Sequence, residues 1–101
     1  MKMIKQLAIV IGLMLPMISA HAEVDKRARS LAASCSACHG TNGKSVGGMP
    51  VLASLDKAYF VAQMKDFKSG ARPATVMQQQ ASGFTDEEFE LMGSFFEAQK
   101  R

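Results

Sequence analysis

The chain has 101 residues, twelve of them basic and nine acidic, and its formal net charge is +3. This length provides room for one small domain, and the slight excess of positive charge provides no basic face of the kind that binds nucleic acid. Several domains and a nucleic-acid partner are therefore excluded.

Residues 1–22 have the pattern of a secretory signal peptide. Lys2 and Lys5 form a basic start, an apolar stretch follows over 7–18, and Ser19-Ala20-His21-Ala22 ends in the small-x-small pattern of a cleavage site. The apolar run is shorter than the ~20 residues that span a bilayer. The sequence thus predicts cleavage after Ala22, export to the periplasm and no stable membrane span afterwards. A retained membrane anchor is the alternative.

The predicted cleavage leaves residues 23–101 as a single mature domain with ten basic and nine acidic residues, a net charge of +1. His21 is removed, so His39 is the one histidine of the predicted mature chain. Export places the protein in an oxidising compartment. A chain of this size buries a modest core and often needs a metal, a disulfide or a cofactor to be stable.

The first predicted helix covers residues 24–37, where small and apolar residues recur at helical spacing. Small residues there would allow another helix to approach closely. His39-Gly40 ends this helix, and glycine, asparagine and proline then make 40–53 a loop. The second predicted helix covers 55–68 and carries an apolar stripe.

The boundaries of the later elements follow from capping residues. Ser54 is the expected N-cap of the helix over 55–68, with Asp56 in its first turn, and Gly70 is its stop. Residues 71–84 are mostly irregular, with one short helical piece over 76–81 that ends at Gly83.

The last predicted helix begins at Thr85-Asp86-Glu87-Glu88, which is a capping box, and runs to about residue 99. Gly93 is costly inside a helix, so it indicates that another helix, the small-residue first helix, crosses at that point. No convincing run of alternating strand positions is present. The sequence therefore predicts an all-α fold of three main helices plus loops.

The segment Cys35-Ser36-Ala37-Cys38-His39 is the attachment signature of a c-type haem. In this signature the two thiols add across the vinyl groups of the porphyrin, and the following histidine supplies an imidazole to the iron. The chain has no other cysteine. A disulfide between these two would close a small loop and stabilise the fold little. We therefore expect one covalent haem c, with Cys35 and Cys38 as anchors and His39 as an axial ligand.

The second axial ligand is less directly indicated. Methionine is the best remaining soft donor, and methionine–histidine ligation raises the potential of the iron. Met64 and Met92 lie on apolar stripes and are expected in the core. Met77, 38 positions after His39, has enough chain to reach the opposite face of the ring, and it is our choice; Met49 is the runner-up. A lysine or an open coordination site is the further alternative.

A metal-bound histidine also needs its other ring nitrogen held, because that bond fixes the orientation of the ring. Pro50 follows His39 by eleven residues, and its carbonyl is a candidate acceptor. The alternative is that Pro50 only stiffens the loop.

The chain resembles the class I c-type cytochromes of bacteria over nearly all of the predicted mature part. Within that class it is most similar to the cytochrome subunit of flavocytochrome c sulfide dehydrogenase, through residues 63–77, where D-F-K-x-G is followed by R-P-A-T and a methionine. The segments that carry the wider resemblance are Cys35-x-x-Cys38-His39-Gly40, Met49-Pro50-Val51-Leu52, 59–70, Met77 and Gly83-Phe84-Thr85-Asp86-Glu87-Glu88.

The resemblance implies a small class I cytochrome c fold around one haem, with His39 and Met77 as axial ligands and with Pro50 and Leu52 in the haem environment. Some members of the narrower family carry two haems, whereas this chain has one C-x-x-C-H and would be a monohaem version. Two haem propionates would bring the net charge of the mature protein to about −1.

Several surface residues have two interpretations each. Arg72 and Tyr59 are candidate partners of the haem propionates, since a guanidinium suits a carboxylate, or they are an ordinary solvated arginine and a half-buried tyrosine. Four lysines either ring an exposed haem edge and steer a partner or cover a solvated helix face. These lysines are Lys44, Lys57, Lys65 and Lys68.

The expected function is the carriage of single electrons in the periplasm, with no catalysis by this chain itself. The resemblance implies that the electron donor is the flavoprotein (FAD) subunit of a sulfide dehydrogenase. The alternative is a freely diffusing monohaem carrier to a terminal oxidase or another reductase, with a different redox protein as partner. An apolar docking patch would indicate a subunit, and a charged ring would indicate a carrier.

A more remote alternative is a thiol–disulfide oxidoreductase that uses Cys35 and Cys38. Such enzymes place C-x-x-C at the start of a helix beside a sheet. The absence of a predicted strand before the motif argues against this class. A zinc site is weaker still, because structural zinc takes four ligands and only three plausible ones are present.

Overall fold

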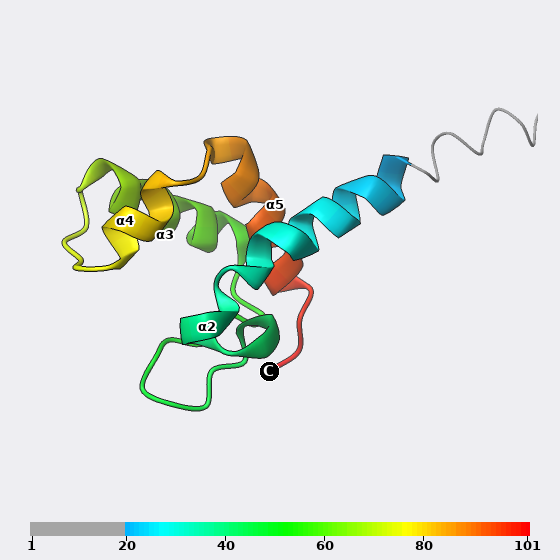
Figure 1. Cartoon of the computed structure of the whole chain (residues 1–101), viewed down its shortest axis with the longest axis horizontal. Helices are drawn as coiled ribbons and strands as arrows, with labels where there is room; N and C mark the ends of the chain where they lie inside the picture. The colour runs from blue at the N-terminus through cyan, green and yellow to red at the C-terminus, as the bar shows by residue number, and fades with distance from the viewer. Residues whose placement is uncertain (1–19) are drawn as a thin grey trace, which may run out of the picture.

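The computed structural model describes residues 20–101, and residues 1–19, most of the predicted signal peptide, lie outside the described residues. The described part is helical, with no strand, as the predicted all-α class requires (Figure 1). A helix over residues 20–33 comes first. It is followed by α2 (Ser36–His39), the 3₁₀ helix η1 (Thr41–Gly43), α3 (Lys57–Ser69), α4 (Met77–Ser82) and α5 (Asp86–Glu97).

The prediction of one continuous first helix over 24–37 is wrong, because the helix ends at residue 33 and α2 is a separate element. The break is made by Ser34, whose hydroxyl donates to the Leu31 carbonyl at 2.8 Å. The backbone N–H of Cys35 then donates to the Ala32 carbonyl at 3.0 Å, a tighter spacing than an α-helix uses. The C-x-x-C-H motif therefore occupies a short turn of its own.

α3 begins two residues later than predicted, and its N-cap is Asp56 rather than Ser54. The Asp56 carboxylate accepts from the Tyr59 backbone N–H at 3.0 Å. Ser54 adopts a positive φ of 61°, and its N–H donates to the carbonyl of Phe96 at 2.8 Å. Ser54 is therefore bonded to α5 and does not cap α3. Gly70 closes α3 in the left-handed conformation, as predicted.

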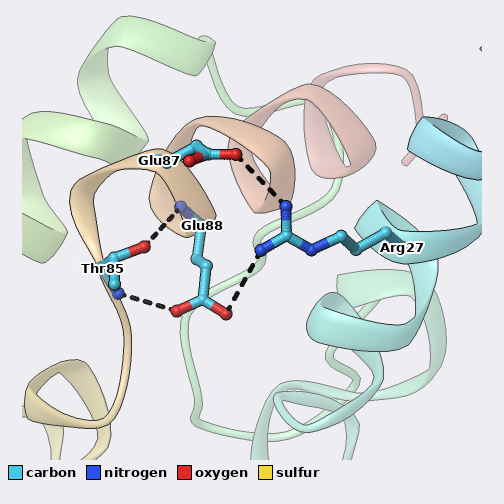
Figure 2. A network of polar contacts seen from close by, with 4 residues as sticks. All are labelled: Arg27, Thr85, Glu87 and Glu88. Carbon is cyan, nitrogen blue, oxygen red and sulfur yellow. Dashed lines mark hydrogen bonds and ion pairs between the residues drawn. The ribbon is translucent and has the colours of Figure 1, made fainter.

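α5 begins with the predicted capping box, which the structure confirms. The Thr85 hydroxyl accepts from the Glu88 N–H at 3.2 Å, and the Glu88 carboxylate accepts from the Thr85 N–H at 2.9 Å. Figure 2 shows that Arg27 of the first helix reaches the same carboxylate, at 3.9 Å, and that of Glu87, at 3.2 Å. The first helix is thus tied to the N-terminal turn of α5.

The helix that approaches α5 at Gly93 is α3, so the prediction that the first helix crosses there is wrong. A Cβ added at Gly93 would lie 3.2 Å from side-chain carbons of both Lys57 and Phe60. Phe60 also packs on Phe96, with ring centroids 5.5 Å apart. The α3–α5 contact is therefore the centre of the fold, and glycine allows it.

The core lies between α3 and α5 and is completed by one alanine each from the first helix and α4. Met92 is fully buried and Met64 is 4% exposed, as their positions on apolar stripes predicted. None of the helices among residues 20–101 is long and apolar enough to cross a membrane. The core cluster consists of Ala32, Phe60, Val61, Met64, Ala81, Phe89, Met92 and Phe96.

The loop after η1 is held beside the core by contacts with Gly43. Gly43 has a φ of +75°, and its carbonyl accepts from the N–H groups of Leu52 and Ala53 at 2.9 and 3.1 Å. A Cβ at Gly43 would lie 2.8 Å from the Leu52 Cβ and 2.9 Å from a ring carbon of Phe96. This contact fixes both ends of the 44–51 segment beside α5.

Candidate functional site

An apolar cleft of about 250 Å³ lies between α2, the loop after it, α3 and α4. All eight residues that the sequence predicted for the site line this cleft: Cys35, Cys38, His39, Pro50, Leu52, Tyr59, Arg72 and Met77. The cavity is far larger than the ~15 Å³ that one water molecule requires. Its size and lining suit a large apolar ligand.

His39 enters the cleft from the last position of α2 and is 7% exposed. Its Nδ1 lies 2.8 Å from the carbonyl oxygen of Pro50, the acceptor that the spacing suggested. Because a carbonyl can only accept, Nδ1 carries the proton and donates. The lone pair on Nε2 is then available to a metal ion, which is the arrangement that orients metal-bound histidines in general.

The two cysteines belong to the same turn: Cys35 is the half-buried N-cap of α2, and Cys38 lies within α2 and is exposed. Burial raises the pKa of the Cys35 thiol; a hydrogen bond with Ser34 acts in the opposite direction, and the nearby Cys38 raises the pKa further. Redox-active C-x-x-C motifs depend instead on a lowered thiol pKa. The raised pKa of Cys35 and the lack of a strand among residues 20–101 both argue against the thiol–disulfide oxidoreductase interpretation.

Three methionines line the cleft, from three different segments. Met77 is the first residue of α4 and is half-buried against the core, whereas Met49 lies in the loop and is 43% exposed. Met64 comes from the buried face of α3. The sequence assigned Met64 to the core alone, and the structure places it in both the core and the cleft.

One face of α3 forms a wall that the sequence described only as an apolar stripe. Phe60, Met64 and Phe67 all line the cleft, and Gln63 lies among them. Their i, i+4, i+7 spacing was visible in the sequence, but spacing cannot tell a core from a ligand cleft. The remaining lining residues that were not predicted are Ser34, Leu55, Val76, Gln80 and Phe84.

The charged groups around the cleft are few. Arg72 lines it and is exposed, and its guanidinium carbon lies 4.9 Å from the centroid of the Phe67 ring. None of the four lysines considered as a ring lines the cleft. Two of them have other partners, since Lys57 pairs with Glu90 at 3.3 Å and Lys68 donates to the Phe84 carbonyl at 2.5 Å. The rim is therefore mostly apolar.

The donor set in this cleft fits a covalently attached haem. An oriented imidazole, thioethers and two thiols on one turn are the groups that a c-type haem uses, and apolar side chains suit the faces of the macrocycle. No cluster of three or more His, Cys, Asp or Glu side chains able to hold a metal ion is present among residues 20–101.

Comparison with known proteins gives a consistent result. A family model described as cytochrome c matches residues 26–98. Over 72 residues the chain is 38% identical to the "Cytochrome subunit of sulfide dehydrogenase" of Chlorobaculum tepidum, covering 71% of this chain and 66% of that protein. It is also 38% identical over 73 residues to the "Thiosulfate dehydrogenase electron acceptor" of Stutzerimonas stutzeri, covering 70% of this chain and 34% of that protein.

A third relative is "Cytochrome c4" of Pseudomonas aeruginosa, 35% identical over 83 residues, with 80% of this chain and 41% of that protein covered. The chain therefore spans less than two thirds of the length of each of these three relatives.

Proposed function

The chain belongs to the cytochrome c family, and from this premise we propose that it is the haem subunit that accepts electrons from a flavoprotein sulfide dehydrogenase in the periplasm. Family membership implies a covalently bound haem c and an electron-transfer role. The proposal goes further in three respects: it names the partner, it includes export by a cleaved signal peptide over 1–22, and it assigns roles to individual residues.

In this proposal Cys35 and Cys38 anchor the haem, and His39 and Met77 bind its iron. When bound, the haem supplies reversible one-electron redox chemistry. The Pro50 carbonyl holds the imidazole of His39 in one orientation through Nδ1. The aromatic and aliphatic wall of α3 would shield the bound haem from water. Two side-chain ligands, His39 and Met77, would both be given to the iron, an arrangement that suits electron transfer rather than substrate binding.

The observation that carries the choice of a subunit is the apolar rim of the cleft. Met49, Tyr59 and Val76 lie at this rim, where a bound haem would cover part of each side chain and a partner could cover the rest. Stable interfaces have apolar, aromatic-rich centres, whereas charge rings serve to steer diffusing partners. Since no lysine lines the cleft, the surface favours a docked subunit over a freely diffusing carrier.

A second candidate function has its own support. The Stutzerimonas stutzeri relative is named as an electron acceptor of thiosulfate dehydrogenase. The same cleft would serve a carrier for that class of donor, because the haem site does not identify the donor. The two candidates differ in whether a flavoprotein stays bound.

The test is an absorption spectrum of the tagged protein purified from its native periplasm under mild conditions. Haem bands together with flavin absorbance in near-stoichiometric ratio would support the flavoprotein complex, and sulfide would then be the first substrate to assay. Haem bands without flavin would favour the diffusing carrier. The mass of the same sample tests export, because cleavage after Ala22 makes Glu23 the first residue.

A matched pair of variants tests the docking surface in the same preparation. Val76→Lys places a charge on the rim, and Val24→Lys places one on an equally exposed valine of the first helix, outside the cleft. We expect the first variant to lose the flavin and the second to keep it, with covalent haem retained in both. Retention of flavin by Val76→Lys would place the interface elsewhere.

The anchoring role is tested by Cys35→Ala. We expect haem to be weakly held or lost after denaturation, as read by haem staining of a denaturing gel, with Ser36→Ala as the control. Unchanged covalent haem in Cys35→Ala would contradict the assignment.

A further inference from the structure

Arg72 is held beside the cleft by three contacts with α3. Its guanidinium lies over the Phe67 ring at 4.9 Å, and one of its terminal nitrogens donates to the side-chain oxygen of Gln63. Its backbone N–H donates to the Asp66 carbonyl at 3.1 Å. A position over an aromatic ring and a hydrogen bond from the guanidinium together restrict its orientation. An exposed arginine without such contacts would sample many rotamers.

The positive charge of Arg72 has no partner among the described residues. The ion pairs of residues 20–101 join Arg27 to Glu87 and Glu88, and Lys57 to Glu90. Arg72 is the one arginine or lysine that lines the cleft. Because Gln63 accepts from a single nitrogen, the guanidinium keeps several N–H donors for an anion.

We propose that Gln63 is a positioning residue that holds the Arg72 guanidinium to bind a propionate carboxylate of the haem. This inference rests on the proposed function, in which the haem is bound in the cleft. Gln63 acts through Arg72 and does not itself need to touch the haem. A fixed positive charge beside the haem stabilises the state with one more electron, so the pair raises the reduction potential.

The test is a double-mutant cycle on the purified, haem-loaded protein without any partner, with the reduction potential as readout. The variants are Gln63→Met, Arg72→Gln and the double variant. We expect Arg72→Gln to lower the potential, Gln63→Met to lower it by a smaller amount, and the double variant to match Arg72→Gln. Gln79→Met, an exposed glutamine of α4 outside the cleft, is the control and should leave the potential unchanged.

Additive shifts, or no shift in Gln63→Met, would overturn the positioning role. No shift in Arg72→Gln would overturn propionate binding and would leave an acidic group of the partner as the anion for this arginine. The nitrogen NMR signal of the Arg72 side chain gives a second readout, because its slow exchange with water should be lost in Gln63→Met. Failure of the proposed haem site is distinguishable, since it would appear as unchanged covalent haem in the Cys35→Ala variant.

Discussion

Two methionines compete for the iron, and they differ in how firmly the chain holds them. Met77 begins α4, which is anchored by the fully buried Ala81. Met49 follows Gly47 and Gly48, and a Cβ added at either glycine would have no other atom within 4 Å. A ligand that stays bound in both oxidation states needs a fixed position, so we expect Met77 to be the ligand.

Met77→Ala should therefore lower the reduction potential and convert the iron to a high-spin form or admit another ligand. The far-red sulfur-to-iron absorption band of the oxidised protein should disappear, because the thioether that produces it is gone. Met49→Ala is the control and should keep the band. The reverse pattern would transfer the ligand role to Met49.

Cys35, Cys38, His39 and Met77 could be proposed as anchors and ligands from the sequence because a thiol, an imidazole or a thioether is identifiable wherever it lies. Leu52 has no such chemistry, and only the resemblance suggested it.

The N-cap of α3 was predicted wrongly because residue type alone could not decide between two candidates. Ser54 and Asp56 are both good N-cap residues, and the choice between them is made by the bond from the Ser54 N–H to Phe96, 42 residues away. Such a tertiary contact leaves no local signal.

Glu88 takes part in two structural contacts at the scale of whole helices. It completes the capping box of α5, and it pairs with Arg27 of the first helix (Figure 2). Its side chain is 21% exposed, compared with 77% for Glu87. The start of α5 and the attachment of the first helix therefore share one carboxylate.

Glu88→Ala should lower the free energy of unfolding of the haem-loaded protein by about 1 kcal/mol, since it removes both the cap contact and the ion pair. Glu88→Gln keeps an acceptor for the Thr85 N–H and should cost only a few tenths of a kcal/mol. Chemical denaturation followed by circular dichroism measures both. Glu87→Gln, in an exposed pair, is the control; equal losses in all three variants would argue against the shared role of Glu88.

Gly93 decides how closely α3 and α5 approach. The sequence correctly indicated a helix crossing here but assigned it to the wrong helix, because a glycine shows that a partner is close and not which partner it is. Small residues of the first helix made it the natural candidate. In the structure, Lys57 and Phe60 of α3 are the residues that lie against Gly93.

Gly93→Val should destabilise the haem-loaded protein by about 1–3 kcal/mol through crowding against α3. Thermal melting followed by the haem absorbance measures the effect. Gly47→Val, where a Cβ meets nothing within 4 Å, is the matched control and should leave the melting temperature nearly unchanged. A tolerated Gly93→Val would mean that α3 and α5 can separate without cost.

At the scale of the molecule, the cleft and the core share their walls. Phe60 and Met64 are core residues that also line the cleft, and half-buried side chains such as Leu52 and Met77 pack against the same cluster. The predicted mature chain is short, so the apolar area it buries leaves a small margin over the loss of chain entropy. A large apolar cofactor in the cleft would supply much of the missing contact.

We therefore expect the haem-free chain to be largely unfolded. Circular dichroism of protein made without haem attachment should show little helix and no sigmoidal thermal transition, whereas the haem-loaded protein should melt cooperatively. A cooperative melt of the haem-free chain would show that the α3–α5 core is sufficient by itself.

The contact of Gly43 with Leu52 and Phe96 has a consequence for how this protein can change over generations. A side chain at Gly43 would collide with α5, so lineages that keep the haem should keep glycine there. The segment from 44 to 49 lies beyond that fixed point, includes a fully exposed Val46, and leads to the rim of the cleft. Mutations can accumulate at residues 44–48, none of which lines the cleft, so selection can adapt the protein to a new redox partner there without changing the haem site.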